Sequence, residues 1–172
     1  MTFEWATDLQ RHVGIVVHAM LQNAVEGDGF ETRSSTIVAA LSSQGLSGDR
    51  LREGALRVEK ALRATAVDPR GRWILRRHSE DQREYSLCGV VGGRARHFTL
   101  DRTFVDDAGI RWIIDYKTGS HEGGNLDAFL DNEQARYRPQ LENYKWLMAR
   151  LDSRPIRLGL YFPMLQAWRE WN

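Results

Sequence analysis

The sequence predicts an α/β fold with a helical N-terminal half and a sheet-rich C-terminal half. Apolar residues recur at helical spacing in the first part of the chain. From about residue 84 onward, short alternating or β-branched runs between turn residues replace them. No linker separates the halves, and 172 residues with 42% hydrophobic content can fill one core. We therefore expect a single domain over 1–172, helical to about residue 80 and sheet-rich from about 81 to 172.

The expected helices begin with one from about residue 8 to 25. Its apolar positions share one face and are Leu9, Val13, Val16, Val17, Met20, Leu21 and Val25. A Gly-Asp-Gly turn at 27–29 ends it, and a short helix follows near 35–41. A third helix is expected over 48–67, and Pro69 stops it two residues later.

Strands are expected near 84–91, 95–105 and 110–117, followed by a glycine-rich loop at 119–124. A long helix over about 127–150 and a strand at 156–162 complete the pattern. Cys88 lies in the first of these strands, where we expect a buried structural thiol. His121 lies in the glycine-rich loop, where it is either a substrate contact or simply exposed.

The segment from Asp101 to Lys117 carries the main chemical signal. Asp101 ends an alternating run, and the buried run 112–114 leads directly into Asp115. Because side chains alternate along a strand, Asp115 and Lys117 point to one face, and Asp101 meets them there if the two strands pair as a hairpin. Two carboxylates and an ammonium suit Mg²⁺ or Mn²⁺ and a water that the lysine orients or deprotonates.

The choice of lysine at position 117 adds weight to that pattern. The 24 basic residues include only three lysines, at positions 60, 117 and 145. An ammonium is a compact charge whose pKa can fall beside a metal, a property that a guanidinium lacks. A surface ion pair is the alternative reading of Asp-x-Lys taken alone.

His18 and a glutamine–tyrosine pair extend the candidate site. His18 lies one helical turn after Gly14, so a small residue leaves room for a close neighbour on nearly the same face. A histidine on such a helix is either a structural residue or a ligand. Gln140 and Tyr144 are four residues apart on the long helix, where they support a metal site or form part of an amphipathic core.

Taken in order, G-x-x-x-H, L-D-R, D-Y-K-T-G and Q-x-x-x-Y resemble the RecB-type nucleases of the PD-(D/E)XK superfamily. The best match is to the C-terminal nuclease domain of UvrD-like helicase-nucleases, the AddA/RecB or exonuclease V beta-subunit type. The tail from Ile156 to Pro163, followed by Trp168 to Trp171, looks like the closing strands of that domain. The resemblance implies a restriction-endonuclease-like core, in which helices flank a mixed sheet.

The resemblance also implies roles for individual residues. His18, Asp101 and Asp115 would be side-chain ligands of Mg²⁺ or Mn²⁺, and Tyr116 would add its backbone carbonyl. Lys117 would be the catalytic lysine, with Gln140 and Tyr144 as the supporting motif. The implied reaction is cleavage of single-stranded DNA fed by a UvrD-like helicase motor in recombination and double-strand-break repair.

Cysteine content and hydropathy limit the cofactors and the cellular location that we expect. Some RecB-type relatives carry four cysteines for an iron–sulfur cluster, but this chain has only Cys88, so no such cluster is expected. A lone cysteine fits the reducing cytoplasm. No run approaches the ~18 apolar residues of a membrane helix, and no Gly-Lys-Ser/Thr phosphate loop is present, so this chain is not expected to hydrolyse ATP.

The formal net charge of +1 does not by itself indicate a nucleic-acid-binding protein. The distribution of arginines matters more than their sum. The expected phosphate contacts fall in two clusters, one at Arg72, Arg76 and Arg77 and the other at Arg94, Arg96 and Arg102. A solvated arginine-rich surface is the alternative for each of them.

Two other functions share the same fold. One is a module that binds DNA or a partner protein without cutting. The other is a stand-alone resolvase-like or restriction endonuclease that acts as a dimer. Cleavage patterns on single-stranded, duplex and branched DNA separate the three.

Overall fold

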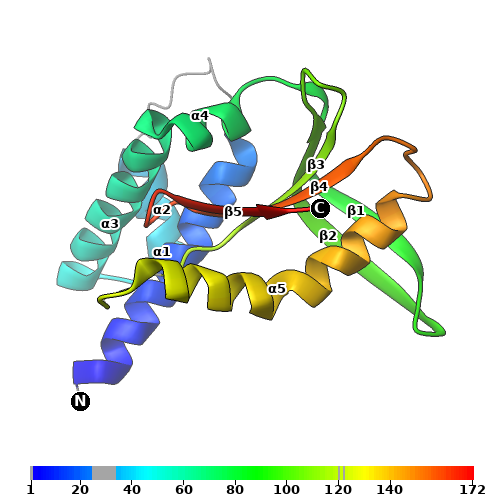
Figure 1. Cartoon of the computed structure of the whole chain (residues 1–172). Helices are drawn as coiled ribbons and strands as arrows, with labels where there is room; N and C mark the ends of the chain where they lie inside the picture. The colour runs from blue at the N-terminus through cyan, green and yellow to red at the C-terminus, as the bar shows by residue number, and fades with distance from the viewer. Residues whose placement is uncertain (1, 25–33, 120, 122) are drawn as a thin grey trace. The chain divides into compact units, whose positions relative to one another are not determined.

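The computed structural model describes residues 2–24, 34–119, 121 and 123–172 (Figure 1). Four helices come first: α1 (Thr2–Asn23), α2 (Ser34–Ser43), α3 (Gly48–Val67) and α4 (Pro69–Leu75). Next come β1 (Ser79–Val91), β2 (Arg94–Val105), β3 (Arg111–Tyr116), α5 (Leu126–Met148), β4 (Ile156–Phe162) and β5 (Ala167–Trp171). The expected turn at 27–29 lies outside the described residues.

The chain divides into two compact units. Unit 1 comprises residues 1–76, 117–120 and 162–166, and unit 2 comprises 77–116, 121–161 and 167–172. Unit 1 holds the first four helices. Its buried side chains include five of the seven predicted apolar positions of α1, and they are Leu9, Val13, Val16, Val17, Leu21, Ile37, Leu41, Val58 and Leu62. Met20 is half-buried, and Val25 lies outside the described residues.

Helix α4 was not expected from the sequence. Pro69 was expected to stop the preceding helix, and α3 does end at Val67. Pro69 also begins α4, because proline is well suited to the first turn of a helix, where its missing N–H loses no bond. Asp68 caps this new helix by accepting a hydrogen bond from the Gly71 N–H at 3.0 Å.

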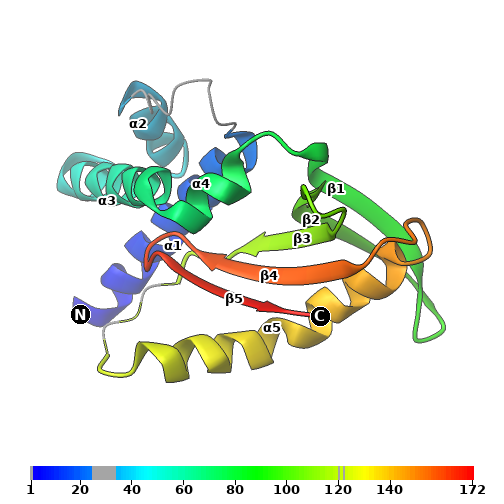
Figure 2. The ribbon, with the colours of Figure 1, turned by 45° about the horizontal axis from the view of Figure 1, so that its top comes forward.

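The five strands form one mixed sheet in the order β1-β2-β3-β4-β5. Strands β1, β2 and β3 pair in antiparallel fashion, whereas β3 and β4 are parallel. A parallel pair needs a long crossover, and α5 supplies it (Figure 2). The predicted mixed sheet flanked by helices, a restriction-endonuclease-like fold, is confirmed.

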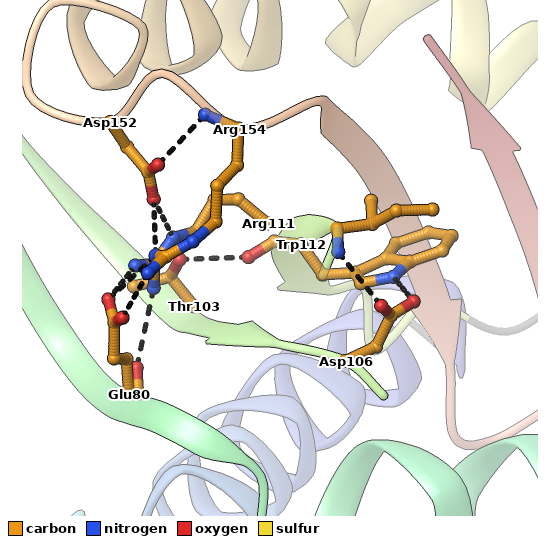
Figure 3. A network of polar contacts seen from close by, with 8 residues as sticks. Glu80, Thr103, Asp106, Arg111, Trp112, Asp152 and Arg154 are labelled. Carbon is orange, nitrogen blue, oxygen red and sulfur yellow. Dashed lines mark hydrogen bonds and ion pairs between the residues drawn. The ribbon is translucent and has the colours of Figure 1, made fainter. Parts of the chain in front are cut away.

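A network of charged side chains anchors the N-terminal end of β3 (Figure 3). Arg111 is buried, donates from Nε to Asp152 at 2.7 Å, and also pairs with Glu80. Arg154 joins the same two acids, at 2.6 Å from Glu80 and 3.1 Å from Asp152. Beside this network, the Trp112 indole N–H donates to Asp106 at 2.8 Å. The end of β3 opposite to Asp115 is therefore fixed in place within unit 2.

Cys88 was expected to be buried, but it is exposed, because it lies opposite His97 in the outer part of the β1–β2 hairpin. His121 is half-buried and stacks on Phe129, with ring centroids 4.7 Å apart.

Within the described residues, no helix is both long enough and apolar enough to cross a lipid bilayer.

Candidate active site

The pairing of β2 with β3 sets the positions of the two aspartates. Arg102 lies opposite Ile114 and Thr103 opposite Ile113, so the register continued by one residue puts Asp101 opposite Asp115. Directly opposite residues of an antiparallel pair project to the same face, with Cβ atoms ~5 Å apart. The two carboxylates are 8% and 6% exposed as whole residues, respectively. The hairpin on which their proximity depended is confirmed.

A hydrogen bond fixes the Asp101 carboxylate at this point of the sheet. Its Oδ2 atom accepts from the backbone N–H of Tyr116 at 2.8 Å. The backbone pairing of β2 with β3 ends at Arg102 and Ile114, and the Asp101 side chain bonds to β3 just beyond that point. A bond from a carboxylate to a backbone N–H is charge-assisted and directional. It holds an oxygen of Asp101 against the backbone that follows Asp115.

Helix α5 brings a phenol to the same place. Tyr144 is buried, its hydroxyl accepts a hydrogen bond from the Gln140 amide, and its ring meets Phe98 edge to face at 5.3 Å. Burial raises the pKa of Tyr144, the Gln140 hydrogen bond opposes that rise, and the negative charges of Asp115 and Asp101 add to it. The Tyr144 hydroxyl therefore lies in the field of both carboxylates and stays neutral and able to donate a hydrogen bond.

Lys117 and His18 belong to unit 1. Lys117 is half-buried and follows Tyr116 directly in the chain. A Cβ atom added at Gly14 would lie 2.5 Å from the Thr118 hydroxyl oxygen, so α1 packs against the 117–120 segment at this glycine. The expectation that Gly14 makes room for a close neighbour is confirmed. His18 is half-buried one turn further along α1, and its role as a ligand stays a prediction.

Arg102 corrects the sequence analysis. It was expected on a DNA-contacting surface, but it is 0% exposed. Its guanidinium holds Asp81 of β1 through two bonds, from Nε at 3.0 Å and from Nη2 at 2.6 Å. On the same face, burial raises the pKa of Tyr116 to about 12, and the positive charge of Arg102 acts against that rise. Arg102 is therefore an internal support of the strand that carries Asp101.

Sequence reasoning missed this role although the signal was present. Neighbouring residues of a strand face opposite sides, so Arg102 had to face away from Asp101. Whether Arg102 then lies in the interior or at the surface depends on the bulky side chains on that face and on an acidic partner, which is Asp81 of β1. The other expected DNA contacts remain accessible: Arg72, Arg77, Arg94 and Arg96 are exposed, and Arg76 is half-buried.

The donors gathered in unit 2 suit a hard divalent cation. Two facing carboxylates and the backbone at Tyr116 offer oxygen atoms, the ligands that Mg²⁺ and Mn²⁺ prefer. Across the described ranges, no group of three or more His, Cys, Asp and Glu side chains is arranged to hold a metal ion. A cation held at the acidic pair would therefore take the rest of its ligands from other groups.

A mixed sheet that carries two facing aspartates on paired strands, with a crossover helix beside them, defines a restriction-endonuclease-like domain. The family model of the PD-(D/E)XK nuclease superfamily matches residues 3–167, and the chain belongs to this superfamily. Its members are nucleases and usually depend on divalent metal ions. None of the curated proteins matches the sequence.

Proposed function

We propose that this chain is a RecB-type nuclease that uses Mg²⁺ or Mn²⁺ to hydrolyse phosphodiester bonds of single-stranded DNA. The observation that carries the proposal is the hydrogen bond from the Tyr116 N–H to Asp101, which holds one carboxylate beside the strand that ends in Asp115. Support for the RecB type comes from the order of motifs in the sequence.

In this proposal Asp101 and Asp115 bind the cation, together with His18 and the Tyr116 carbonyl. The bound cation would polarise the scissile phosphate and stabilise the charge that develops on its oxygens. Lys117 orients the attacking water as an ammonium or, in its neutral amine form, takes up the proton of that water. Gln140 fixes the Tyr144 hydroxyl, and Tyr144, kept neutral beside the two carboxylates, donates a hydrogen bond toward the phosphate.

The setting we propose is the cytoplasm, in recombination and double-strand-break repair, with a UvrD-like helicase motor that feeds the strand. The sequence contains no phosphate-binding Gly-Lys-Ser/Thr loop, so the energy for unwinding must come from another domain or subunit. Arg72, Arg76 and Arg77 are proposed phosphate contacts. If they are, changing all three to alanine lowers the salt slope of single-strand binding by ~0.7 for each phosphate that the protein no longer neutralises.

The test is cleavage of end-labelled single-stranded, duplex and branched DNA in Mg²⁺ or Mn²⁺, with Asp115→Ala and Lys117→Ala as variants. Both variants should lose cleavage. In calorimetric Mn²⁺ titrations only Asp115→Ala should lose metal affinity, because an ammonium is not a ligand. Binding without cleavage in any metal would instead indicate a DNA-binding module, and cleavage confined to branched DNA by a dimer would indicate a resolvase.

A further inference from the structure

A groove runs within unit 2 between the outer part of the β1–β2 hairpin and the C-terminal part of α5, which lie side by side in both views of the ribbon (Figures 1 and 2). Two adjoining hollows of about 590 and 670 Å³ form it, and they share Val91, Gly92 and Asn143. The first is also lined by Arg94, Arg96, Phe98 and Gln140, and the second by Glu142, Lys145, Trp146 and Ala149.

One end of the groove lies at the candidate active site. Phe98 packs edge to face against Tyr144, and Gln140 donates a hydrogen bond to the same phenol. Tyr144 in turn lies in the field of Asp115 and Asp101. The groove therefore begins beside Tyr144 and leads outward along the C-terminal part of α5.

The charges along the groove suit a phosphate backbone. Arg94 and Arg96 are exposed on β2, and Lys145 adds a third cation from α5. The one acid of the lining, Glu142, accepts a hydrogen bond from the Trp171 indole at 2.9 Å and lies 3.8 Å from the Arg138 guanidinium. The lining thus has three cations and one acid that is already engaged, which favours an anionic ligand.

Trp146 gives the groove a large aromatic surface. It lies in the last turn of α5 and is 44% exposed, although tryptophan side chains are on average highly buried. Its neighbour Leu147 takes the inward position, since a Cβ atom at Gly89 would lie 2.3 Å from the Leu147 side chain. Arg150 packs on the Trp146 ring, 3.2 Å from its centroid, and donates a hydrogen bond to the Trp146 carbonyl at 2.8 Å. The ring is held in place while much of it stays open to solvent.

We propose that this groove binds the DNA strand next to the cleavage site, with Arg94 and Arg96 on its phosphates and Trp146 stacked on one of its bases. This inference rests on the proposed nuclease function and specifies its substrate. Stacking on Trp146 needs a base whose face is free, and the faces of bases inside a duplex are covered by their neighbours. The groove therefore selects single-stranded over duplex DNA.

The test measures fluorescence anisotropy of a labelled deoxythymidine strand of ~16 nucleotides. Ca²⁺ replaces Mg²⁺, so that binding is measured without cleavage. Trp146→Ala should weaken binding by about 5- to 150-fold, the loss that removal of one base–aromatic stack gives. Trp146→Phe keeps a ring and should lose less than ~5-fold. Neither should change affinity for a blunt duplex to the same extent.

The arginines are tested through salt. Arg94→Ala combined with Arg96→Ala should flatten the dependence of log affinity on log salt by ~0.7 for each phosphate that is no longer neutralised. The matched control removes Arg52 and Arg63, which are exposed arginines of α3 that do not line the groove. Thermal melts of all variants confirm that the fold is retained.

The outcomes separate this inference from the proposed function. Single-strand affinity and salt slope that stay at the wild-type values in the Trp146 and arginine variants would overturn the groove assignment, even if the wild-type protein cleaves DNA. Conversely, the groove variants could lose binding while the wild-type protein cleaves no DNA in Mg²⁺ or Mn²⁺. That result would support the groove assignment and refute the nuclease function.

Discussion

The two ends of strand β3 use the same kinds of charged residue in opposite ways. At the N-terminal end, Arg111 and Arg154 alternate with Glu80 and Asp152, so each acid has arginine partners (Figure 3). At the C-terminal end, Asp115 lies opposite a second aspartate. The first arrangement stabilises the fold. The second gathers like charges in a buried place, which costs stability and is typical of functional sites.

The pKa directions at the two ends reflect this difference. Hydrogen bonds from Arg154 and then Arg111 lower the pKa of Glu80. Burial raises the pKa of Asp152, but hydrogen bonds from the Arg154 backbone and the Arg111 side chain outweigh it, so this pKa is lowered as well. At the other end the pKa of Tyr144 is raised, by burial first and by the two aspartates in addition. The two acids at the N-terminal end are thus favoured as anions, whereas Tyr144 at the C-terminal end keeps its proton.

The largest expected effect is on activity at the C-terminal end. Asp115→Asn keeps the shape of the side chain and removes its charge. We expect roughly a 10³-fold loss of cleavage rate, equivalent to ~4 kcal/mol of transition-state stabilisation, because a neutral amide is a poor ligand for a hard cation. Single-turnover cleavage of labelled single-stranded DNA measures it.

Stability should respond in the opposite direction. Asp115→Asn removes one of two facing negative charges, so in metal-free buffer the free energy of unfolding should stay the same or rise. Urea unfolding followed by circular dichroism measures this. A loss of stability of several kcal/mol would mean that Asp115 is a structural residue like those at the other end of β3.

The second expected effect is on stability at the N-terminal end. Arg111→Ala leaves the Asp152 carboxylate, whose side chain is 9% exposed, beside Arg154 but without its buried partner, and removal of one partner from a largely buried ion pair costs ~3 kcal/mol or more. Arg157→Ala is the matched control, since this half-exposed arginine pairs with Glu170 and should cost under ~1 kcal/mol. The same urea series measures both. Equal losses in the two variants would contradict a buried, cooperative network at this end.

The sequence predicted the C-terminal end far better than the N-terminal end. The predicted site residues lie within or next to strong strand and helix patterns, so their neighbours follow from alternation and helical spacing. These residues are Asp101, Asp115, Gln140 and Tyr144. The N-terminal network joins residues 80, 111, 152 and 154, which come from three separate segments. No local pattern indicates such pairs, because they depend on where a crossover helix returns the chain.

Burial of individual residues was also hard to predict. Arg102 and Cys88 exchanged their expected places: the arginine is inside and the thiol is exposed. Each sits on a strand whose inner and outer parts have different neighbours. The outer part of the β1–β2 hairpin extends past the rest of the sheet, where Cys88 lies opposite His97, whereas the inner part is covered on both faces. Residue type alone does not reveal that change along one strand.

A third prediction concerns Arg102, which lies in the interior near the C-terminal end of β3. It tests whether this arginine helps to position the two aspartates. Arg102→Lys keeps the positive charge but cannot reproduce the two-bond contact with Asp81. We expect a loss of ~1–2 kcal/mol in stability and a drop in Mn²⁺ affinity, because Arg102 supports Tyr116, whose N–H holds Asp101. Calorimetric Mn²⁺ titration provides the readout that a purely structural role would leave unchanged. Wild-type affinity in a less stable variant would confine Arg102 to the core.

The smallest expected effect concerns Asp106, beside the N-terminal network. Burial raises its pKa, but hydrogen bonds from the Trp112 indole and from the N–H groups of Ile110 and Ala108 together lower it below the ordinary value of ~3.9. A carboxyl whose pKa is lower in the folded state stabilises the fold above the unfolded-state pKa, and this contribution disappears as the pH falls through the folded-state pKa. Asp106→Asn should therefore cost about 1 kcal/mol near neutral pH and progressively less below about pH 4. Urea unfolding of variant and wild type at a series of pH values tests this. Two curves that stay parallel down to about pH 2 would show that packing, and not the charge of Asp106, stabilises this end of the strand.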